Sequence, residues 1–441
     1  MKLKPARSSL MSIKSTPACA LALALSACAT SPLPYNTPLE TQSIVSGNSE
    51  FGVNIYRAGL EAAEQEAAKA GKTVTNFAVS PASISAALAM TYAGARGETE
   101  AEMANVLNFD LPPETLHASM ASVLFGLQTD ADGQTLKINN RVFVDKPVIV
   151  ENAFESQMKN IYKAPLERLD LRGEPEKSRQ HINAWVEDKT EDRIQNLIPT
   201  GGIKPCTRMV LVNTVYLDAN WATPFSARST RDATFTTAEG SEVIAQLMSM
   251  DIRAKYLKTS EFQAVQLPYK GNRLSMVVLL PDSERGLPRL ERQLNGEKLD
   301  RWLAQLSQGE NSLVDLKLPK LEFDASVALG GSLAVLGMPL AFSNGANFDG
   351  IASPTDNPVD PCFTPMRLKL DEVDHKVFVK IDEDGTEAAA ATAARMTVTV
   401  SAQVNAPLPI RFHADHPFLF VIKDNETGMV VFLGRVTDPT T

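Results

Sequence analysis

The sequence predicts an α+β protein whose folded part is one large domain. Helical periodicity is concentrated in the first half of the chain and strand-like runs in the second. The regular alternation of strands and helices that a parallel α/β sheet requires does not occur. The 441 residues are 44% hydrophobic and 22% charged, as in a folded soluble protein, and no segment repeats at a period of about 20 to 50 residues.

Residues 1–27 have the features of a targeting signal. Four Lys or Arg residues and no acid precede or flank the apolar run 18–27, which is too short to span a bilayer. Residues 25–28 (LSAC) resemble a bacterial lipobox, which implies cleavage before Cys28 and acylation of its thiol. We therefore expect an exported protein, lipid-anchored in the bacterial cell envelope on the periplasmic or extracellular face, with the outer membrane favoured. The alternative is an ordinary secretory signal cleaved near Ala27 or Ala29.

The segment 28–48 is rich in Ser, Thr and Pro, and this composition predicts a flexible tether. No domain boundary is visible after it, so residues 49–441 are expected to form a single domain. The net charge of −9 becomes −13 once the four basic residues of the signal are removed, and the chain has no basic stripe. These features argue against a nucleic-acid partner. We expect a monomer.

Three segments show helical periodicity: 50–70, 80–107 and 175–196. Ser80 followed by Pro81 is a typical cap and first-turn pair. Strands are expected where short apolar or alternating runs lie between turn residues, at 136–144, 208–216, 264–267, 274–280, 313–318, 376–381, 418–422 and 429–436.

The chain lacks a recognisable catalytic signature. It has no Gly-x-Ser-x-Gly elbow, no phosphate-binding glycine loop and no His-Glu-x-x-His sequence. His413 and His416 are three residues apart, but Asp415 and Pro417 indicate an extended segment and no cysteine is near, so no metal site is expected. We expect neither enzymatic activity nor a cofactor.

An unusual segment lies near the C-terminus. Gly385 follows three acidic residues and precedes a segment of threonine and alanine, interrupted only by Glu387, that extends to position 394. At period two, the face that begins with Thr386 carries no charge as far as position 398, whereas Glu387 and Arg395 fall on the other face. No proline occurs at 386–405, so nothing prevents ladder hydrogen bonds. The pattern predicts a loop that is able to become a strand with one buried face.

Several blocks resemble those of the serpin family, in the family's order and spacing, from about residue 48 to the C-terminus. They are 76–85 (NFAVSPASIS), 94–97 (GARG), 182–187 (INAWVE), 211–216 (LVNTVY), 221–225 (WATPF), 383–394 and 432–436 (FLGRV). Each block alone is weak evidence, whereas the occurrence of all of them in this order and spacing is specific for the family.

The resemblance implies a serpin fold, with three β-sheets, eight to nine helices and an exposed reactive centre loop, here about 383–409. It also implies an irreversible suicide-substrate inhibitor of serine proteases that has no catalytic residue of its own. The target protease attacks the loop and forms a covalent acyl-enzyme. The cut loop then inserts into the large sheet as a new strand and distorts the protease; serpin loop insertion is itself a standard example of strand addition and stored-strain release.

The resemblance assigns three groups of residues to this mechanism. They are the hinge (Glu383, Gly385, Thr386, Ala388 and Ala390), the shutter beneath the large sheet (Ser80, Ser83, Asn213 and His375), and the breach where insertion starts (Trp221, Lys320 and Glu383). Lys320 and Glu383 are expected to form an ion pair. The hinge has the small side chains of inhibitory members, because a charge on its inward face would be buried without a partner during insertion.

The resemblance also locates the reactive bond. Counting seventeen residues from Glu383, as in inhibitory serpins, places it between Thr399 and Val400. These small and β-branched residues suit a shallow pocket of the elastase or subtilisin type. The loop is several residues longer than in typical animal serpins, so the bonds after Val398 and before Ser401 stay open as alternatives. Cleavage at Arg395 by a trypsin-like enzyme would leave the inserted strand four residues short, and we expect it to be substrate turnover.

Two other functions stay open: a non-inhibitory serpin that acts as a binding or chaperone-like module, and cross-class inhibition of cysteine proteases. Cys19 and Cys28 belong to the signal region, which leaves Cys206 and Cys362 as two free thiols or as a disulfide in an exported protein. By the resemblance, these two cysteines lead into the strands that part during insertion. A bridge between them would restrain that opening.

Overall fold

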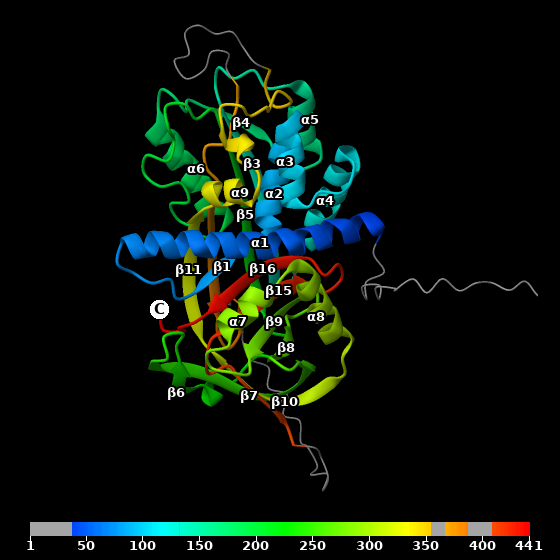
Figure 1. Ribbon diagram of the computed structural model, residues 1–441, viewed down its shortest axis with the longest axis vertical. Coiled ribbons are helices and arrows are strands. Elements are labelled where there is room, and N and C mark those ends of the chain that lie inside the picture. Colours follow the sequence, from blue (N-terminus) through cyan, green and yellow to red (C-terminus); the bar gives the residue numbers. More distant parts are fainter. Residues whose placement is uncertain (1–37, 132, 354–366, 387–407) are drawn as a thin grey trace, which may run out of the picture. The chain divides into compact units, whose positions relative to one another are not determined.

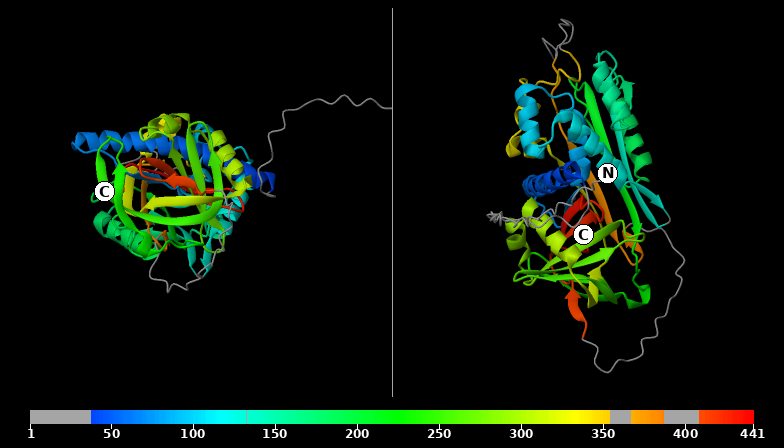
Figure 2. Two further views of the ribbon diagram at one scale, coloured as in Figure 1. Left: turned by 90° about the horizontal axis from the view of Figure 1, so that it is seen from below. Right: turned by 90° about the vertical axis from the view of Figure 1, so that its right-hand side faces the viewer.

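The computed structural model describes residues 38–131, 133–353, 367–386 and 408–441. They belong to one compact unit, Pro34–Thr441, in which the strands form two hydrogen-bonded networks and helices pack against them (Figures 1 and 2). The α-helices of the described residues are α1 (Leu39–Lys69), α2 (Pro81–Tyr92), α3 (Gly97–Leu107), α4 (Pro113–Leu127), α5 (Asn152–Asn160), α6 (Pro175–Lys189), α7 (Leu287–Gln293), α8 (Gly296–Gln308) and α9 (Gly330–Leu336).

The first sheet has seven strands. Its order is β11 (Leu321–Ala328), β12 (Asp374–Ile381), β13 (Gly385–Thr386), β5 (Met209–Asn220), β3 (Gln134–Asp145) and β2 (Thr129–Ala131), and β4 (Leu166–Leu169) pairs with β3. Buried and exposed residues alternate strictly along β11, as expected of a strand with one face on the core. The long strands β3 and β5 run antiparallel from the pair Gln134–Ala219 to the pair Val144–Met209.

The second hydrogen-bonded network has nine strands, and it contains two sheets that share β7. Its order is β1 (Phe77–Val79), β16 (Val430–Val436), β15 (Phe418–Asp424), β9 (Leu274–Pro281), β8 (Phe262–Pro268), β7 (Glu242–Lys258), β10 (Asn311–Pro319) and β14 (Ile410–His413), with β6 (Arg231–Thr236) also on β7. The last residues of β7 pair with β8, whereas its earlier residues pair with β10 and β6. This continuity explains why the three expected sheets form two hydrogen-bonded networks.

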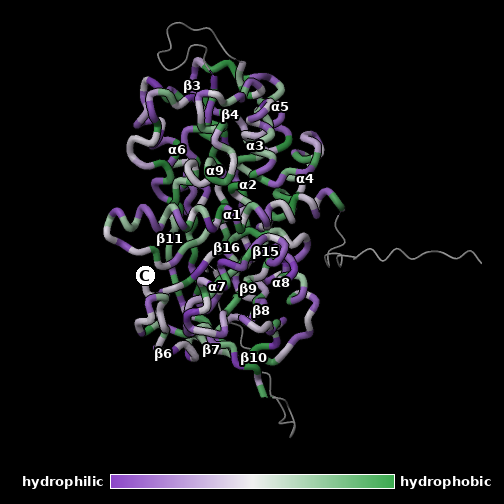
Figure 3. Tube along the Cα trace, in the orientation of Figure 1, coloured by the Kyte–Doolittle hydropathy of each residue, from purple (hydrophilic) through white to green (hydrophobic). Residues whose placement is uncertain are grey.

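The core lies between the two networks. Every residue of β9 and of β15 is buried, and Figure 3 shows hydrophobic segments (green) where these strands run. Helix α2 contacts both β5 and β16 and is buried on nearly every side, which accounts for its apolar sequence. Because α2 lies between the sheets, the residues at its start reach both of them.

The expected tether is wrong over its last ten residues, because α1 begins at Leu39 and crosses in front of the strands (Figure 1). Ile44 and Val45 of this segment are 4% and 2% exposed, and the side-chain amide of Asn48 donates to the carbonyl oxygen of Val430 at 3.1 Å. Long-range contacts thus hold a Ser- and Thr-rich segment as helix. Residues 28–37 of the expected tether, like the signal 1–27, lie outside the described residues.

The remaining elements follow the sequence pattern in part. Each of the eight expected strands is present, with ends shifted by a few residues. The segment expected to be helical at 80–107 divides into α2 and α3 at the turn containing Gly94, where a Cβ would lie 2.0 Å from Cγ1 of Ile351. The third expected helix ends at Lys189 rather than near 196. The 17-residue β7 was missed because its exposure does not follow one period.

Candidate functional site

Strands β5 and β12 are separated by a gap, which β13 closes at one end. In the described residues β5 and β12 do not pair with each other. Instead, β13 pairs antiparallel with both, so that Thr386 lies opposite Ala219 on one side and Ile381 on the other. A Cβ on Gly385 would lie 2.0 Å from the carbonyl oxygen of Ala219, so only glycine fits there. The start of the hinge therefore occupies the first two positions of a central strand.

Trp221 holds the turn that leads into the hinge. Its backbone N–H donates to the carbonyl oxygen of Asp384 at 2.8 Å, and its indole N–H donates to that of Asp382 at 2.9 Å. The carboxylate of Asp382 accepts from the N–H groups of Asp384 and Gly385, which makes an Asx-type turn. The indole is 4% exposed. The direction in which the chain enters the gap is thus fixed by a buried aromatic side chain and by backbone hydrogen bonds.

The ion pair expected between Lys320 and Glu383 is present, with Nζ 2.8 Å from Oε2. The other carboxylate oxygen of Glu383 accepts from the hydroxyl of Thr230 at 2.7 Å. Burial alone would raise the pKa of Glu383, but the hydrogen bonds from Lys320 and Thr230 outweigh it and hold the pKa below its usual value. The Lys320 side chain is 34% exposed, so we expect the pair to contribute about 1 kcal/mol or less.

The four shutter residues form one hydrogen-bonded network that joins β12, α2 and β5. The backbone N–H of Ser80, the cap of α2, donates to Nε2 of His375 at 3.0 Å. The Ser80 hydroxyl donates to the carbonyl oxygen of Val431 in β16 at 2.7 Å. The hydroxyl of Ser83 donates to Oδ1 of Asn213. The cap of one buried helix thereby connects the two strands that border the gap with the second network.

His375 is a neutral member of this network. Burial lowers its pKa to about 4, so the ring is uncharged at neutral pH. This state is the one required, because Nε2 accepts the Ser80 N–H and a protonated ring has no acceptor.

Asn213 and His375 lie at the same level of the gap. Asn213 precedes Ala219 by six residues, and His375 precedes Ile381 by six, while Ala219 and Ile381 both pair with Thr386. At about 3.3 Å per residue, the shutter is therefore roughly 20 Å from the hinge. A cavity of about 130 Å³ opens here, lined by Asn213 and His375 and by apolar side chains of α2 and β5. The even spacing also places these side chains on the face to which Thr386 belongs.

Cys206 lies beyond the shutter and borders the same cavity. It is disulfide-bonded, which excludes a free thiol at this position. The expected partner, Cys362, lies outside the described residues, as do Cys28 and the inward hinge residues Ala388 and Ala390. The reactive-bond residues Thr399 and Val400, with the alternatives Val398 and Ser401, also lie outside them.

Three residues that the sequence did not single out complete the site. Asn140 of β3 accepts from Nδ2 of Asn213 at 2.6 Å, and Thr230 binds Glu383 as described. Tyr269 stacks on Trp221 with ring centroids 4.7 Å apart. Their positions depend on strand register and on a contact between two sheets, and no local pattern carries that information.

The two histidines near the C-terminus serve structural contacts. His413 Nε2 lies 2.8 Å from Oδ2 of Asp315, and His416 lies 2.8 Å from both Asp415 Oδ1 and the carbonyl oxygen of Pro281. Among the described residues, no cluster of three or more His, Cys, Asp or Glu side chains could hold a metal ion.

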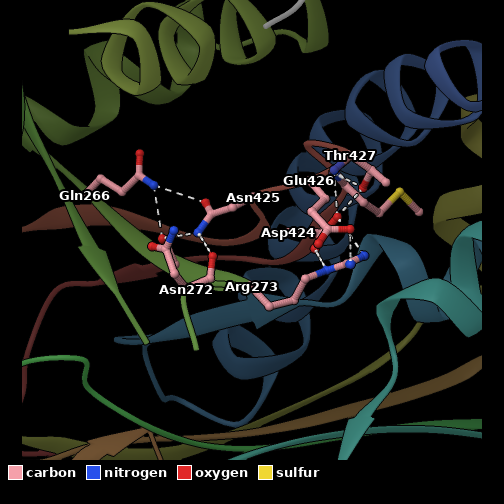
Figure 4. Close-up of polar contacts among 9 residues, drawn as sticks. Gln266, Asn272, Arg273, Asp424, Asn425, Glu426 and Thr427 are labelled. Carbon is pink, nitrogen blue, oxygen red and sulfur yellow. Dashed lines mark hydrogen bonds and ion pairs between the residues drawn. The ribbon is translucent and has the colours of Figure 1, made fainter. Parts of the chain in front are cut away.

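A dense polar cluster at the turn between β15 and β16 also has a structural role (Figure 4). The buried carboxylate of Asp424 binds Arg273 and accepts from the N–H and hydroxyl of Thr427. The side-chain amide of Asn425 donates to the Asn272 carbonyl oxygen at 3.0 Å and to the Ser275 hydroxyl at 2.7 Å. These bonds fix the turn that connects two core strands.

Comparison with known proteins identifies the fold around this gap. The profile described as "Serpin (serine protease inhibitor)" matches residues 46–439. Serpin B6 of Macaca fascicularis is 37% identical over 369 residues, which cover 82% of this chain and 93% of the relative. The leukocyte elastase inhibitor of Sus scrofa is 33% identical over 405 residues, covering 90% of this chain and all of the inhibitor.

The structural comparison agrees with the sequence comparison. Human thyroxine-binding globulin, crystallised with thyroxine, superposes with a TM-score of 0.76 at 27% identity, over 91% of this chain and the whole of the globulin. The profile match spans both networks, the hinge and the shutter. The chain belongs to the serpin family and has the serpin fold.

Proposed function

We propose that this protein is an irreversible suicide-substrate inhibitor of serine proteases that traps its target by loop insertion. One observation carries the proposal: Gly385 and Thr386 already lie between β5 and β12, at the end of a gap that the rest of a strand would fill. The uncharged period-two face from Thr386 onward supplies a suitable strand. The similarity to the leukocyte elastase inhibitor of Sus scrofa supports the same assignment.

The catalytic groups of the covalent step are those of the protease. Its serine oxygen attacks the carbonyl carbon of Thr399, the peptide bond to Val400 breaks, and a proton passes to the leaving amine. The acyl ester would then move with the loop as residues after Thr386 enter the gap. Small β-branched residues at the bond favour an elastase-like or subtilisin-like target, and the bonds on either side, after Val398 and before Ser401, are the alternatives. A cysteine protease would form a thioester by the same geometry.

A binding or chaperone-like role is the second candidate. Thyroxine-binding globulin has the same fold and was crystallised with thyroxine, so the fold alone does not decide between inhibition and binding. The small residues of the hinge favour inhibition, because a strand with no inward charge can enter the gap without burying an unpaired ion.

The experiment that separates these functions uses the purified protein with elastase-like, subtilisin-like, trypsin-like and papain-like proteases. We expect SDS-resistant complexes with at least one of the first two, and sequencing of the released C-terminal fragment should begin at Val400. Clean cleavage by all four enzymes without any complex would exclude inhibition and leave the binding role.

We also propose that the protein is a bacterial lipoprotein anchored through Cys28 in the cell envelope, with the outer membrane favoured. The support is the apolar run followed by LSAC at 25–28. None of the helices from residue 38 onward that the structure describes is long and apolar enough to cross a membrane. Labelling cells with radioactive palmitate should mark the wild-type protein but not a Cys28→Ser variant. Equal labelling of both would refute the anchor at this residue.

A further inference from the structure

The hydroxyl of Tyr269 lies 2.5 Å from Oγ1 of Thr386, the first inward-facing residue of the hinge. Tyr269 is fully buried and Thr386 is 4% exposed. A buried hydroxyl without a partner is destabilising, so each of these two hydroxyl groups favours the position in which it meets the other. The contact therefore favours Thr386 in the gap rather than in solvent.

The position of Tyr269 is itself fixed by its neighbours. Its backbone N–H donates to the carbonyl oxygen of Leu274 at 3.0 Å, within the turn between β8 and β9. Its ring stacks on Trp221 at an interplanar angle of 8°, and the two residues form an isolated antiparallel bridge. Tyr269 thus reaches the hinge from the nine-stranded network, whereas Thr386 belongs to the seven-stranded sheet. The hydroxyl pair is a contact between the two networks at the point where insertion begins.

The contact also fixes the register of the entering strand. Side chains of a strand alternate between its two faces, so a shift by one residue would turn every inward residue outward. If the hinge entered one residue out of register, Glu387 would take the inward position of Thr386 and bring a carboxylate to the buried phenol. The hydroxyl pair favours the register in which the uncharged face points inward.

We propose that Tyr269 is a positioning residue for loop insertion. Its hydroxyl holds Thr386 at the start of the gap before the loop is cut, and so increases the fraction of protease encounters that end in a trapped complex rather than in substrate turnover. This inference rests on the proposed inhibitory function. A seated hinge needs only to extend along the gap, whereas a released one must first find its register while the acyl-enzyme hydrolyses.

The test compares the full-length protein with Tyr269→Phe, Thr386→Val, Thr386→Ser and the double variant Tyr269→Phe/Thr386→Val. The loop is cut by a protease, the rate of insertion is followed by tryptophan fluorescence, and the stoichiometry of inhibition is measured with a protease that the wild type traps. One ordinary hydrogen bond changes an equilibrium by about fivefold. We therefore expect the ratio of turnover to trapping, which is the measured stoichiometry minus one, to rise about fivefold in each of Tyr269→Phe and Thr386→Val. The double variant should be no worse than either, and Thr386→Ser should behave as wild type.

Tyr56→Phe is the matched control. Tyr56 lies on α1 and is also buried, and its hydroxyl donates to the carboxylate of Glu291 at 2.7 Å. Its loss should lower the melting temperature without changing the rate of insertion or the stoichiometry. A merely structural role for Tyr269 would give the same result in Tyr269→Phe, and that result would overturn the inference.

The two proposals fail in different ways. If cutting the wild-type loop brings no gain in thermal stability, the loop does not insert, and the proposed function fails together with the inference. If the wild-type loop inserts and Tyr269→Phe inserts at the same rate, the inference alone is wrong. If the loop inserts but no protease is trapped, the proposed function fails, and the insertion rates still test Tyr269. Slower insertion in Tyr269→Phe than in the wild type would support its positioning role, and an equal rate would overturn it.

Discussion

At the hinge end of the gap between β5 and β12, the polypeptide itself fills the space, whereas at the shutter end the cap and the first turn of α2 bridge it. Gly385 and Thr386 supply backbone hydrogen bonds to both strands. Roughly 20 Å away, Ser80 binds His375 on one side of the gap and Ser83 binds Asn213 on the other. The two ends thus use different contacts for the same purpose, which is to hold two unpaired strands.

The difference indicates the direction in which a strand can be added. At the hinge end, Gly385 and Thr386 already pair with the two neighbouring strands, as an inserted strand would. A strand that enters there only extends these existing backbone pairs. The shutter consists of separate hydrogen bonds, each of which contributes about 1 kcal/mol and can be exchanged for another. Insertion from hinge to shutter, as proposed above, would therefore build on the first set of contacts and replace the second.

The largest effect should come from a charge at the hinge end. Thr386→Arg would bury a guanidinium among Ala219, Ile381 and Tyr269 at a cost of several kcal/mol. The ratio of turnover to trapping, which is the stoichiometry of inhibition minus one, should therefore rise by about 100-fold or more. Titration of a trapped protease measures this. Glu387→Arg introduces the same side chain on the opposite face of the sequence pattern and should inhibit as wild type. Unchanged inhibition by Thr386→Arg would mean that the protease is not trapped by insertion.

A smaller effect, on the free energy of unfolding, is expected from loss of the disulfide of Cys206, which lies beyond the shutter. If Cys362 is its partner, Cys206→Ser and Cys362→Ser should each lower the free energy of unfolding by about 2–4 kcal/mol, as measured by urea denaturation. The double variant should lose no more than either single one, because both residues share one bond. Additive losses, or equal thiol titration of the wild type with and without reductant, would contradict this pairing.

The shutter should also respond to pH. The pKa of His375 is about 4 in the folded protein, below the usual value of about 6.5, so the unfolded chain binds the proton first as the pH falls. The stability that His375 contributes is complete above about pH 6.5 and is lost towards pH 4, by about 2 kcal/mol at pH 5. A synthetic peptide of residues 386–398 should therefore enter the gap faster at pH 5 than at pH 7.

His117 provides the control for this experiment. Burial also lowers its pKa to about 4, and its Nδ1 lies 2.6 Å from the hydroxyl of Tyr162, away from the gap. His117→Gln should remove its own part of the acid destabilisation and keep the faster peptide entry at pH 5. His375→Gln should lose the acceleration. If it does not, protonation of the shutter histidine does not control the opening.

The smallest effect tests the register between the two ends. Since Thr386 lies opposite Ala219 and Ile381, a strand inserted without a slip brings Thr392 between Asn213 and His375. Its hydroxyl would then replace part of the broken network. Thr392→Val should lower the stability of the loop-cleaved form by about 1 kcal/mol, and Thr392→Ser should not. An equal loss in the uncleaved protein would place the contact of Thr392 elsewhere.

The sequence located eight of the 16 strands of the described residues and the shutter residues, but it misplaced the start of α1. The strand at 274–280 is an almost continuous apolar run and the strand at 376–381 alternates, so both have a local signal. The serpin blocks contain Ser80, Asn213 and Trp221 within recognisable surroundings. The segment that begins at Leu39 looked like a tether because its composition is polar, whereas its helix depends on contacts with residues several hundred positions away. Composition records local preference and carries no information on such packing.

By itself, the sequence determined that residues from 385 onward can form a strand with one uncharged face, because that property depends only on a period of two. It also determined the family, because several blocks occur in a specific order. Only the tertiary structure decided that Thr386 lies between Ala219 and Ile381, and that the hydroxyl of Tyr269 meets it there. Register and contacts between sheets join residues far apart in the chain, and their energies arise only when the whole core is assembled.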